Sequence, residues 1–395
     1  MGPDTAMADA REIFFVTGEV SGDRHAAPVV GKLRARGMSV SGVGGEGMRA
    51  AGAKLIADST HWGVMGVPQA LRRLPALLIR ERWLQAALRR LRPPIVVLVD
   101  FGAFNVRLAR YLRKTRLSRV FYYFPPGSWR QEPRDWSSLA ALTDCIATPF
   151  AKNAEHLAAS GANAHWVGHP IVDTLAPVAD RAALRAELGL RQKPPVVGVL
   201  PGSRQAERRT IGPLMVRAMR TILDTMPECG FLWSCLPHTN HTDDRLLARL
   251  SQDVRIARVD DSRDIIRASD LLLATMGTAT LEAAAALTPM VTTYDASFVA
   301  KWIAARLLKQ QQAFYSMPNL MLGRPAVPEV VPLGPADRIT AQRIARPALA
   351  LLRDGAARKA MQADLGLVRD LLGRPGVAAR TADLIMQALD EEPRN

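Results

Sequence analysis

Short apolar runs alternate along the chain with longer amphipathic segments, a pattern typical of a parallel β-sheet covered by helices. The run IVVLV at residues 95–99 contains no polar position, as expected of a strand buried on both faces. Such runs predict strands at residues 13–17, 40–43, 95–99, 120–124, 145–148, 165–167, 196–200, 231–236, 255–259, 271–274 and 290–294. Amphipathic segments at residues 341–353 and 378–390 predict helices near the C-terminus.

The alternation stops near residues 170–177 and begins again at residue 196. Two such halves predict an α/β protein built from two Rossmann-like, doubly wound domains that face a cleft. Ligands bind such sheets at the carboxyl ends of their strands. We expect an N-terminal domain at residues 1–175, a second domain at residues 176–345 and closing C-terminal helices at residues 346–395.

Residues 69–92 combine leucines and Trp83 at helical spacing with many arginines. One interpretation is an ordinary sheet-covering helix with a solvated basic face. The other is a basic amphipathic helix that docks on an anionic membrane surface. The sequence leaves both interpretations open.

The formal net charge of +15 favours anionic partners, such as phosphorylated substrates, an anionic membrane or nucleic acid. Aromatic residues make up only 6% of the chain and are not interleaved with basic residues, so no nucleic-acid partner is expected. Cys145, Cys229 and Cys235 have neither metal-ligand spacing nor a disulfide framework. No signal peptide and no apolar run of transmembrane length is visible, so we expect a cytoplasmic protein.

The segment GEVSGD at residues 18–23 follows the first predicted strand. Its glycines permit a tight turn, and the helix that begins there presents free N–H groups. Glu19, at the mouth of the sheet, is a candidate for contacting a sugar hydroxyl or for proton transfer. Asp23 is either part of this site or simply an acidic residue at a helix N-terminus.

Asp100 directly follows the buried strand at residues 95–99, so it lands at the carboxyl edge of the sheet. This placement makes it our candidate general base. Asn105 is better suited than Asp100 to cap the next helix. His169, in a Gly-His-Pro tripeptide, either faces the cleft or has a structural hydrogen-bonding role.

Two turns in the second half are candidates for binding a diphosphate. The segment LPGSRQAE places Gly202 and Ser203 in a turn followed by Arg204, whose guanidinium suits a diphosphate leaving group. The segment MGTATLE is a strand-to-helix turn whose free N–H groups suit a phosphate, and its Glu282 suits two ribose hydroxyls. No Asp-x-Asp metal motif precedes these turns, so we expect neither a metal nor a cofactor.

Seven segments carry a family resemblance: GEVSGD, GVMGVPQALRRLP, VDFGAFN, VGHPIVDTL, LPGSRQAE, MGTATLEAAA and MPNLMLGRPAVPEVV. They resemble, in the same order, the GEASGD, VMGxxEVL, IDAPDFN, VGHPLxD, LPGSRxxE, SGTATLE and LPNLLAGRxxVPE of the lipid-A-disaccharide synthase family. The matches run from about residue 17 to residue 331. The resemblance implies the GT-B fold, in which two Rossmann-like domains form a glycosyltransferase.

The resemblance also implies the reaction and the partners. The family's enzyme is an inverting hexosyltransferase that joins UDP-2,3-diacylglucosamine to 2,3-diacylglucosamine 1-phosphate, giving lipid A disaccharide 1-phosphate and UDP. The implied partners are a UDP-sugar donor, an acylated sugar phosphate acceptor and the anionic surface on the cytoplasmic face of the inner membrane. The family is also commonly an intertwined homodimer. The UDP-sugar is a substrate and not a cofactor.

Carried over by position, Glu19 and Asp100 match the family's catalytic acids. Four further positions match its nucleotide-side residues, namely Arg204, Thr278, Glu282 and Asn319. With the turn residues added, the predicted nucleotide-binding set is Gly202, Ser203, Arg204, Glu207, Gly277, Thr278, Glu282 and Asn319.

Several positions depart from the family pattern. On the acceptor side, Ala103 replaces a second aspartate and the loop at residues 124–130 is one residue shorter. On the donor side, Met276 replaces a serine and Asp295 stands where the family usually has arginine. These departures leave open a UDP-sugar 2-epimerase, another lipid glycosyltransferase, or a non-catalytic descendant that binds a UDP-sugar or lipid.

Overall fold

The computed structural model describes residues 12–60, 62–63, 67–128, 135–175, 180–190, 195–203, 205–235, 245–248, 250, 255–294, 313–332 and 337–391, without the side chains of residues 67–74 and 206. The chain divides into two compact units. The first unit contains residues 1–173 and 372–395, and the second contains residues 174–371. Each unit is built around its own parallel sheet.

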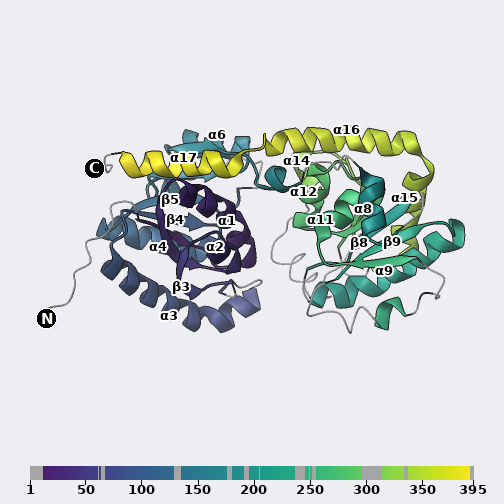
Figure 1. The fold of residues 1–395 in the computed structure, drawn as a ribbon, viewed down its shortest axis with the longest axis horizontal. Coiled ribbons are helices and arrows are strands. Elements are labelled where there is room, and N and C mark those ends of the chain that lie inside the picture. The colour runs from purple at the N-terminus through teal and green to yellow at the C-terminus, as the bar shows by residue number, and fades with distance from the viewer. Residues whose placement is uncertain are drawn as a thin grey trace. The chain divides into compact units, whose positions relative to one another are not determined.

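The first unit contains a seven-stranded sheet with the order β3-β2-β1-β4-β5-β6-β7, in which all neighbours are parallel (Figure 1). The strands are β1 (Glu12–Val16), β2 (Ser39–Gly44), β3 (Lys54–Asp58), β4 (Ile95–Val99), β5 (Arg119–Tyr123), β6 (Cys145–Thr148) and β7 (Ala164–Trp166). The order runs outward in both directions from the β1–β4 pair, so the sheet is doubly wound and β1–β4 is its switch point.

Helices cover both faces of this sheet. They are α1 (Val20–Ala35), α2 (Glu46–Ala50), α3 (Val67–Leu91), α4 (Gly102–Thr115), α5 (Ser137–Ala140), α6 (Ala151–Ala159), α7 (Ile171–Thr174), which runs to the unit boundary, and α17 (Val377–Asp390). Phe14 and Val96 pack with α3 and α4 on one face, while α1 and α17 pack together on the other (Figure 1). The strand residues alternate between these two layers, which explains the continuous apolar run in β4.

The C-terminal helix α17 returns to the first unit, where Asp173 caps it. The backbone N–H groups of Gly376, Val377 and Ala378 donate to the Asp173 carboxylate at 2.6, 3.3 and 3.2 Å. The free N–H groups and the dipole of a helix N-terminus both favour a carboxylate there. The predicted C-terminal helices are therefore shared between the units, because α15 and nearly all of α16 belong to the second.

The second unit contains a six-stranded parallel sheet with the order β10-β9-β8-β11-β12-β13. Its strands are β8 (Val196–Leu200), β9 (Gly230–Ser234), β10 (Ile256–Val259), β11 (Leu271–Thr275), β12 (Met290–Thr293) and β13 (Glu329–Val330). Its helices are α8 (Arg181–Glu187), α9 (Gln205–Thr225), α11 (Ser262–Ala268), α12 (Thr278–Ala285), α14 (Met317–Leu322), α15 (Ala341–Arg353) and α16 (Gly355–Leu372). The β8–β11 pair is the switch point of this sheet.

The structure confirms the predicted fold class, and each predicted strand is present within about two residues of its expected bounds. Two strands were not predicted, β3 and β13. Strand β3 lies at a sheet edge with Lys54 and Asp58 exposed, and its apolar run at residues 55–57 is only three residues long. Strand β13 has only two residues.

Helix α3 combines features of the two interpretations that the sequence left open, a sheet-covering helix and a helix with an exposed apolar face. Leu84 and Leu88 are fully buried in the core of the first unit, as in a sheet-covering helix. Ile79 and Trp83 are 68% and 43% exposed, and their spacing of four residues places them on one face. Leu84 therefore does not belong to a lipid-facing surface, whereas Ile79 and Trp83 remain candidates for one among the described side chains of α3.

Candidate active site

Asp100 lies at the switch point of the first unit, directly after β4. Its backbone N–H donates to the Tyr123 carbonyl at 3.0 Å, and its side chain is half-buried. Burial raises the pKa of the Asp100 carboxyl above its usual value, and a hydrogen bond from the Phe101 N–H opposes this rise. A carboxylate with a raised pKa is a stronger base, as proton abstraction from a hydroxyl requires.

Asp100 and Phe101 both adopt left-handed backbone conformations, with φ of 49° and 53°. This region disfavours residues that carry a side chain, and such outliers concentrate at functional sites. The outliers belong to the turn that carries the predicted base.

Asn105 does not cap α4, so that expectation was wrong. The helix begins after Phe101, and Asn105 lies inside its first turns. The Asn105 Nδ2 group instead donates back to the carbonyls of Val99 and Asp100, at 3.2 and 2.9 Å. The amide has this alternative because the left-handed turn brings these carbonyls toward the helix.

Glu19 lies in the turn after β1, and this turn contacts the turn after β4. A Cβ atom added to Gly18 would lie 2.2 Å from the Phe101 ring, so the ring occupies the space that a side chain would need. The Glu19 side chain itself lies against Gly63, where an added Cβ would be 2.1 Å from the Glu19 Cγ. The structure thus brings the turns that carry both predicted catalytic acids together at one sheet edge.

Asp23 has a structural role at helix N-termini, in agreement with the second of the two interpretations of this residue. Its carboxylate accepts hydrogen bonds from the N–H groups of Gly45, Gly47 and Met48, at 2.7, 2.9 and 3.1 Å. Asp23 thus lies in the first turn of its own helix, α1, and its carboxylate also caps α2 and holds the turn after β2 against α1.

Two histidines and an aromatic side chain border the site on the side of β5. The rings of His25 and Phe124 are stacked with centroids 4.3 Å apart, and His169 meets both rings edge-on. Burial, with a smaller effect of Arg24, lowers the pKa of His25 to about 4. Burial, with a smaller effect of His25, holds the pKa of His169 well below its usual value. Both rings are therefore neutral near pH 7.

The structural role left open for His169 is supported by its hydrogen bonds. The Ile171 N–H donates to His169 Nδ1 at 3.2 Å, which fixes the proton of the neutral ring on Nε2. The His169 N–H donates to the Leu372 carbonyl at 2.7 Å, so this residue also joins the two ends of the first unit's chain.

In the second unit, the two predicted phosphate-binding turns lie side by side at the switch point. Leu200 of β8 pairs with Ala274 of β11, and the turns follow these two strands. Gly202 has a φ of 112°, a conformation that only glycine adopts without strain. Gly277 directly precedes α12, whose first N–H groups have no partner within the helix.

Arg208 is a functional candidate that our sequence analysis missed. Its side chain is 1% exposed, and its Nη1 donates to the Gly202 carbonyl at 3.1 Å. Its Nη2 donates to the Ser234 carbonyl at the end of β9. A guanidinium thus lies directly beneath the first glycine turn. The helical spacing of the sequence could have indicated this burial. Arg208 lies three and seven residues before Ile211 and Met215, which are buried in α9, so it lies on the same helix face.

The other predicted nucleotide-side residues have different surroundings. Thr278 begins α12 with an exposed side chain, and Glu282 is half-buried one turn later. The Glu207 side chain lies against Gly202, where an added Cβ would be 2.7 Å from a carboxylate oxygen. Ser203 is exposed in the turn itself. Arg204, like Asp295, lies outside the described residues.

The Asn319 amide is fully used within the protein. Its Oδ1 accepts from the N–H groups of Ala326 and Val327 at 2.7 and 2.8 Å. Its Nδ2 donates to the Val327 carbonyl at 2.9 Å and to Glu329 Oε1 at 2.8 Å. Two donors and two acceptor positions exhaust a primary amide. Asn319 therefore positions the loop that leads into β13, and its contact with a nucleotide stays a prediction.

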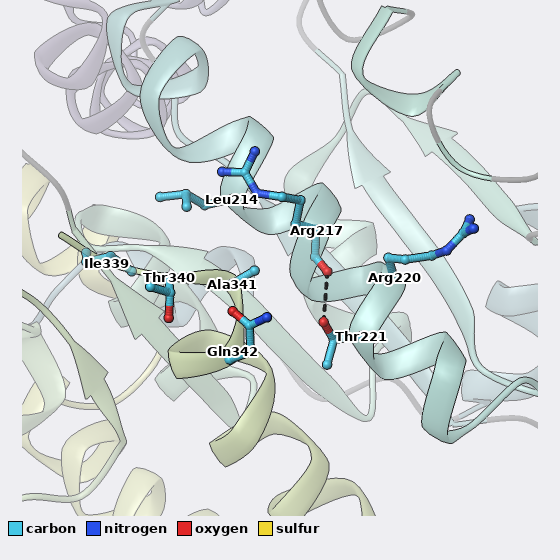
Figure 2. A pocket seen from close by; sticks show the side chains of 8 residues that line it. All are labelled: Leu214, Arg217, Arg220, Thr221, Ile339, Thr340, Ala341 and Gln342. Atoms are coloured by element: carbon cyan, nitrogen blue, oxygen red, sulfur yellow. Dashed lines mark hydrogen bonds between the residues drawn. The ribbon is translucent and has the colours of Figure 1, made fainter.

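A groove of about 460 Å³ lies between α9 and α15, away from these turns (Figure 2). Its lining residues are Leu214, Arg217, Arg220, Thr221, Ile339, Thr340, Ala341 and Gln342, none of which belongs to the turns after β8 and β11. Figure 2 shows the guanidinium groups of Arg217 and Arg220 pointing apart, so they do not form a joint anion site. The groove is separate from the predicted nucleotide residues.

Comparison with known proteins agrees with the motif pattern. A family model described as lipid-A-disaccharide synthetase matches residues 13–378. The lipid-A-disaccharide synthase of Myxococcus xanthus is 32% identical over 97% of this chain and 99% of its own length. That of Syntrophus aciditrophicus is 31% identical over 95% of this chain and 97% of its own length. The chain belongs to the lipid-A-disaccharide synthase family.

This family consists of glycosyltransferases, and solved structures support the GT-B fold. The Staphylococcus aureus MnaA–UDP co-structure has a TM-score of 0.65 at 12% identity and covers 98% of this chain and 99% of that one. Acinetobacter baumannii MurG has a TM-score of 0.58 at 14% identity and covers 95% and 99%. A UDP-GlcNAc 2-epimerase from Neisseria meningitidis scores 0.59 at 11% identity, again over 95% and 99%. At such identities the likeness concerns the fold alone.

None of the described helices is both long and apolar enough to cross a membrane. Within the described residues, no three His, Cys, Asp or Glu side chains are grouped so that they could hold a metal ion.

Proposed function

We propose that this protein is an inverting glycosyltransferase that joins UDP-2,3-diacylglucosamine to 2,3-diacylglucosamine 1-phosphate. The observation that carries the proposal is that, within each unit, two turns with candidate site residues lie next to each other at the switch point of the sheet. The Glu19 and Asp100 turns contact each other in the first unit, and the Gly202 and Gly277 turns follow paired strands in the second. Membership of the lipid-A-disaccharide synthase family supports these substrates.

In this mechanism Asp100 removes the proton from the attacking acceptor hydroxyl, with Glu19 as its orienting partner. The hydroxyl oxygen attacks the anomeric carbon from the face opposite UDP, and the bond from that carbon to the diphosphate oxygen breaks. UDP leaves with the bonding electrons, and inversion follows from the direction of attack. The raised pKa of Asp100 supports its role as the base.

We assign the leaving diphosphate to the second unit. The glycine turns supply backbone N–H groups, and Arg204 and Arg208 supply positive charge without a metal. The remaining set comprises Ser203, Glu207, Thr278, Glu282 and, through the loop that it positions, Asn319. The reaction should therefore proceed in excess EDTA, and a strict metal requirement would contradict this assignment.

The decisive experiment is a UDP-release assay with purified protein and both acylated monosaccharides. We expect UDP to appear only when donor and acceptor are both present, together with a disaccharide of inverted configuration. Donor epimerised without an acceptor would instead indicate a UDP-sugar 2-epimerase. Binding of the donor without any turnover would indicate a non-catalytic descendant.

We also propose that the protein binds the anionic cytoplasmic face of the inner membrane through α3, and that it forms a homodimer. The exposed Ile79 and Trp83 and the helix's arginines support the membrane contact. The Ile79→Ser/Trp83→Ser variant should bind anionic vesicles about tenfold more weakly or worse, since each apolar side chain contributes on the order of 1–3 kcal/mol. Vesicle sedimentation measures this effect, and sedimentation velocity in detergent measures the dimer.

Leu84→Ser is the matched control for the membrane experiment, because Leu84 is fully buried in the core. This variant should lower the melting temperature strongly, whereas Ile79→Ser/Trp83→Ser loses only the edge contact of Trp83 with the Trp62 ring and should lower it much less. Unchanged vesicle binding of the folded double variant would contradict the assignment of α3.

A further inference from the structure

The turn that carries the predicted base contains an unusual backbone, because two consecutive residues with side chains are left-handed. Asp100 and Phe101 have φ of 49° and 53°. Aspartate is tolerated in this conformation better than most residues, but phenylalanine is not. A conformation of this kind persists only where surrounding groups hold it.

Two side chains from different elements, α4 and β5, hold the Asp100 backbone. Asn105 Nδ2 of α4 donates to the Asp100 carbonyl at 2.9 Å, and the Tyr122 hydroxyl of β5 donates to the same oxygen at 3.0 Å. Asn105 Nδ2 also donates to the Val99 carbonyl at 3.2 Å. The last carbonyl of β4 and the first carbonyl of the turn are therefore fixed by side chains rather than by the sheet.

Asn105 is retained at a cost to packing. It is fully buried, and its Oδ1 has no hydrogen-bond partner among the described residues. A buried acceptor without a partner is destabilising, so an apolar side chain would suit this core position better if packing were its only role. What asparagine offers over an apolar side chain is the N–H groups of its amide, which donate to the carbonyls of the turn.

The turn after β4 also packs against the turn after β1, which carries Glu19. The Phe101 ring stacks on Phe104 with centroids 4.7 Å apart and fills the space above Gly18. Gly18 directly precedes Glu19. Fixing the backbone at Asp100 and Phe101 therefore also fixes the Asp100 carboxylate relative to the Glu19 turn.

We infer that Asn105 and Tyr122 are positioning residues that clamp the Asp100 backbone and so aim the general base at the acceptor hydroxyl. This inference rests on the proposed function, in which Asp100 is the base. Neither side chain needs to touch a substrate. Their effect on turnover passes through Asp100 alone.

The expected effects follow from the geometry. A displacement of about 1 Å at a reacting group lowers turnover by roughly 10²-fold. Asn105→Ala, which removes two hydrogen bonds, should therefore lower kcat by about 10²-fold. Tyr122→Phe removes one and should lower it several-fold. The KM for both substrates and the affinity for UDP should stay nearly unchanged.

A double-mutant cycle separates positioning from general destabilisation. If the clamp acts only through Asp100, adding Asn105→Ala to Asp100→Asn should cause no further loss of kcat. Tyr122→Phe should behave in the same way, and it preserves ring packing, so it serves if Asn105→Ala does not fold. The matched control is Asn153→Ala in α6, another buried asparagine whose Oδ1 accepts from the Thr148 hydroxyl at 2.6 Å. Any loss of kcat in that control should add to that of Asp100→Asn.

The outcomes are distinguishable. A full additional loss on combining Asn105→Ala or Tyr122→Phe with Asp100→Asn would overturn the clamp and leave the proposed function standing. Unchanged kcat in both single variants would also overturn it. Near-normal kcat in Asp100→Asn would instead remove Asp100 as the base, and the clamp inference with it.

Discussion

The turns at the two switch points all follow central strands of their sheets, but the turn after β8 and the turn after β4 are built in opposite ways. In the second unit, the turn after β8 places a glycine at a φ of 112°. In the first unit, the turn after β4 places Asp100 and Phe101 at φ of 49° and 53°. A glycine turn leaves backbone N–H groups open to a bulky anion, whereas the other turn carries a carboxylate on a strained backbone.

The electrostatic surroundings of the turns differ in the same sense. The buried guanidinium of Arg208 lies under Gly202 and donates to its carbonyl. Among the described residues, it is the Phe101 N–H that opposes the effect of burial on the pKa of the Asp100 carboxyl. The second unit is thus prepared to receive negative charge, and the first to take up a proton. In the proposed mechanism, two units of the same fold type serve the two ends of the reaction through different turn residues, because function lies in the site and not in the fold.

The largest expected effect concerns the carboxylate of the first turn. Asp100→Asn keeps the shape and the hydrogen bond from Phe101 but removes the basicity, so kcat should fall by about 10²–10⁴-fold. The affinity for UDP, measured by calorimetry, should stay nearly intact because the nucleotide is assigned to the other unit. Glu19→Gln is the control, and a larger loss there would make Glu19 the base and Asp100 its orienting partner.

A smaller effect is expected from the cations of the second turn. Arg204→Ala should weaken UDP binding by about 1.5–3 kcal/mol, the range for hydrogen bonds to charged groups. Arg208→Met should weaken it by roughly tenfold through the lost charge, while uridine, which has no phosphate, should bind as before. Arg208→Lys keeps the charge and should recover part of the loss. Arg209→Ala, at the exposed neighbouring position, is the matched control.

Calorimetry with UDP and uridine shows whether Arg208 acts through its charge on the diphosphate or only through the conformation of the turn. Equal weakening of both ligands in Arg208→Met would mean that Arg208 only shapes the loop. Unchanged UDP affinity in a folded Arg204→Ala protein would remove the diphosphate from this turn altogether.

The sequence predicted the strands and the turns because both depend on local patterns. The run IVVLV coincides with β4, and the glycines at 202 and 277 mark turns at strand ends. The roles of Asn105 and Arg208 could not be predicted in the same way. Each donates to carbonyls that only the folded backbone brings within reach, so the sequence suggested a helix cap for Asn105 and no role for Arg208.

Exposure along α3 shows a second limit of sequence reasoning. Trp83 and Leu84 are adjacent and both apolar, so the sequence alone does not tell which of them faces the sheet. In a helix, consecutive residues point about 100° apart, so one is buried and the other exposed. Helical spacing predicts that α3 has an apolar face. Which residues of that face are buried depends on how the helix packs on the sheet.

The smallest expected effect compares two carboxylates within the first unit, Asp23 and Asp100. Asp23 is buried and accepts three backbone N–H groups, one of which an asparagine would meet with its own N–H. Asp23→Asn should therefore destabilise the protein by about 1–3 kcal/mol. The resulting fall in melting temperature sets the scale for the opposite effect at Asp100.

Asp100→Asn should raise the melting temperature near pH 8, because ionising a buried carboxylate opposes folding. Since the folded pKa of Asp100 lies above its unfolded value of 3.8, the stability of the wild type relative to this variant is greatest below that value. It is lost as the pH rises through the folded pKa. The difference in melting temperature should thus shrink as the pH falls from 8 toward 4. A variant that is less stable than the wild type at pH 8 would show that the ionised carboxylate stabilises its turn, and would contradict the comparison between the two units.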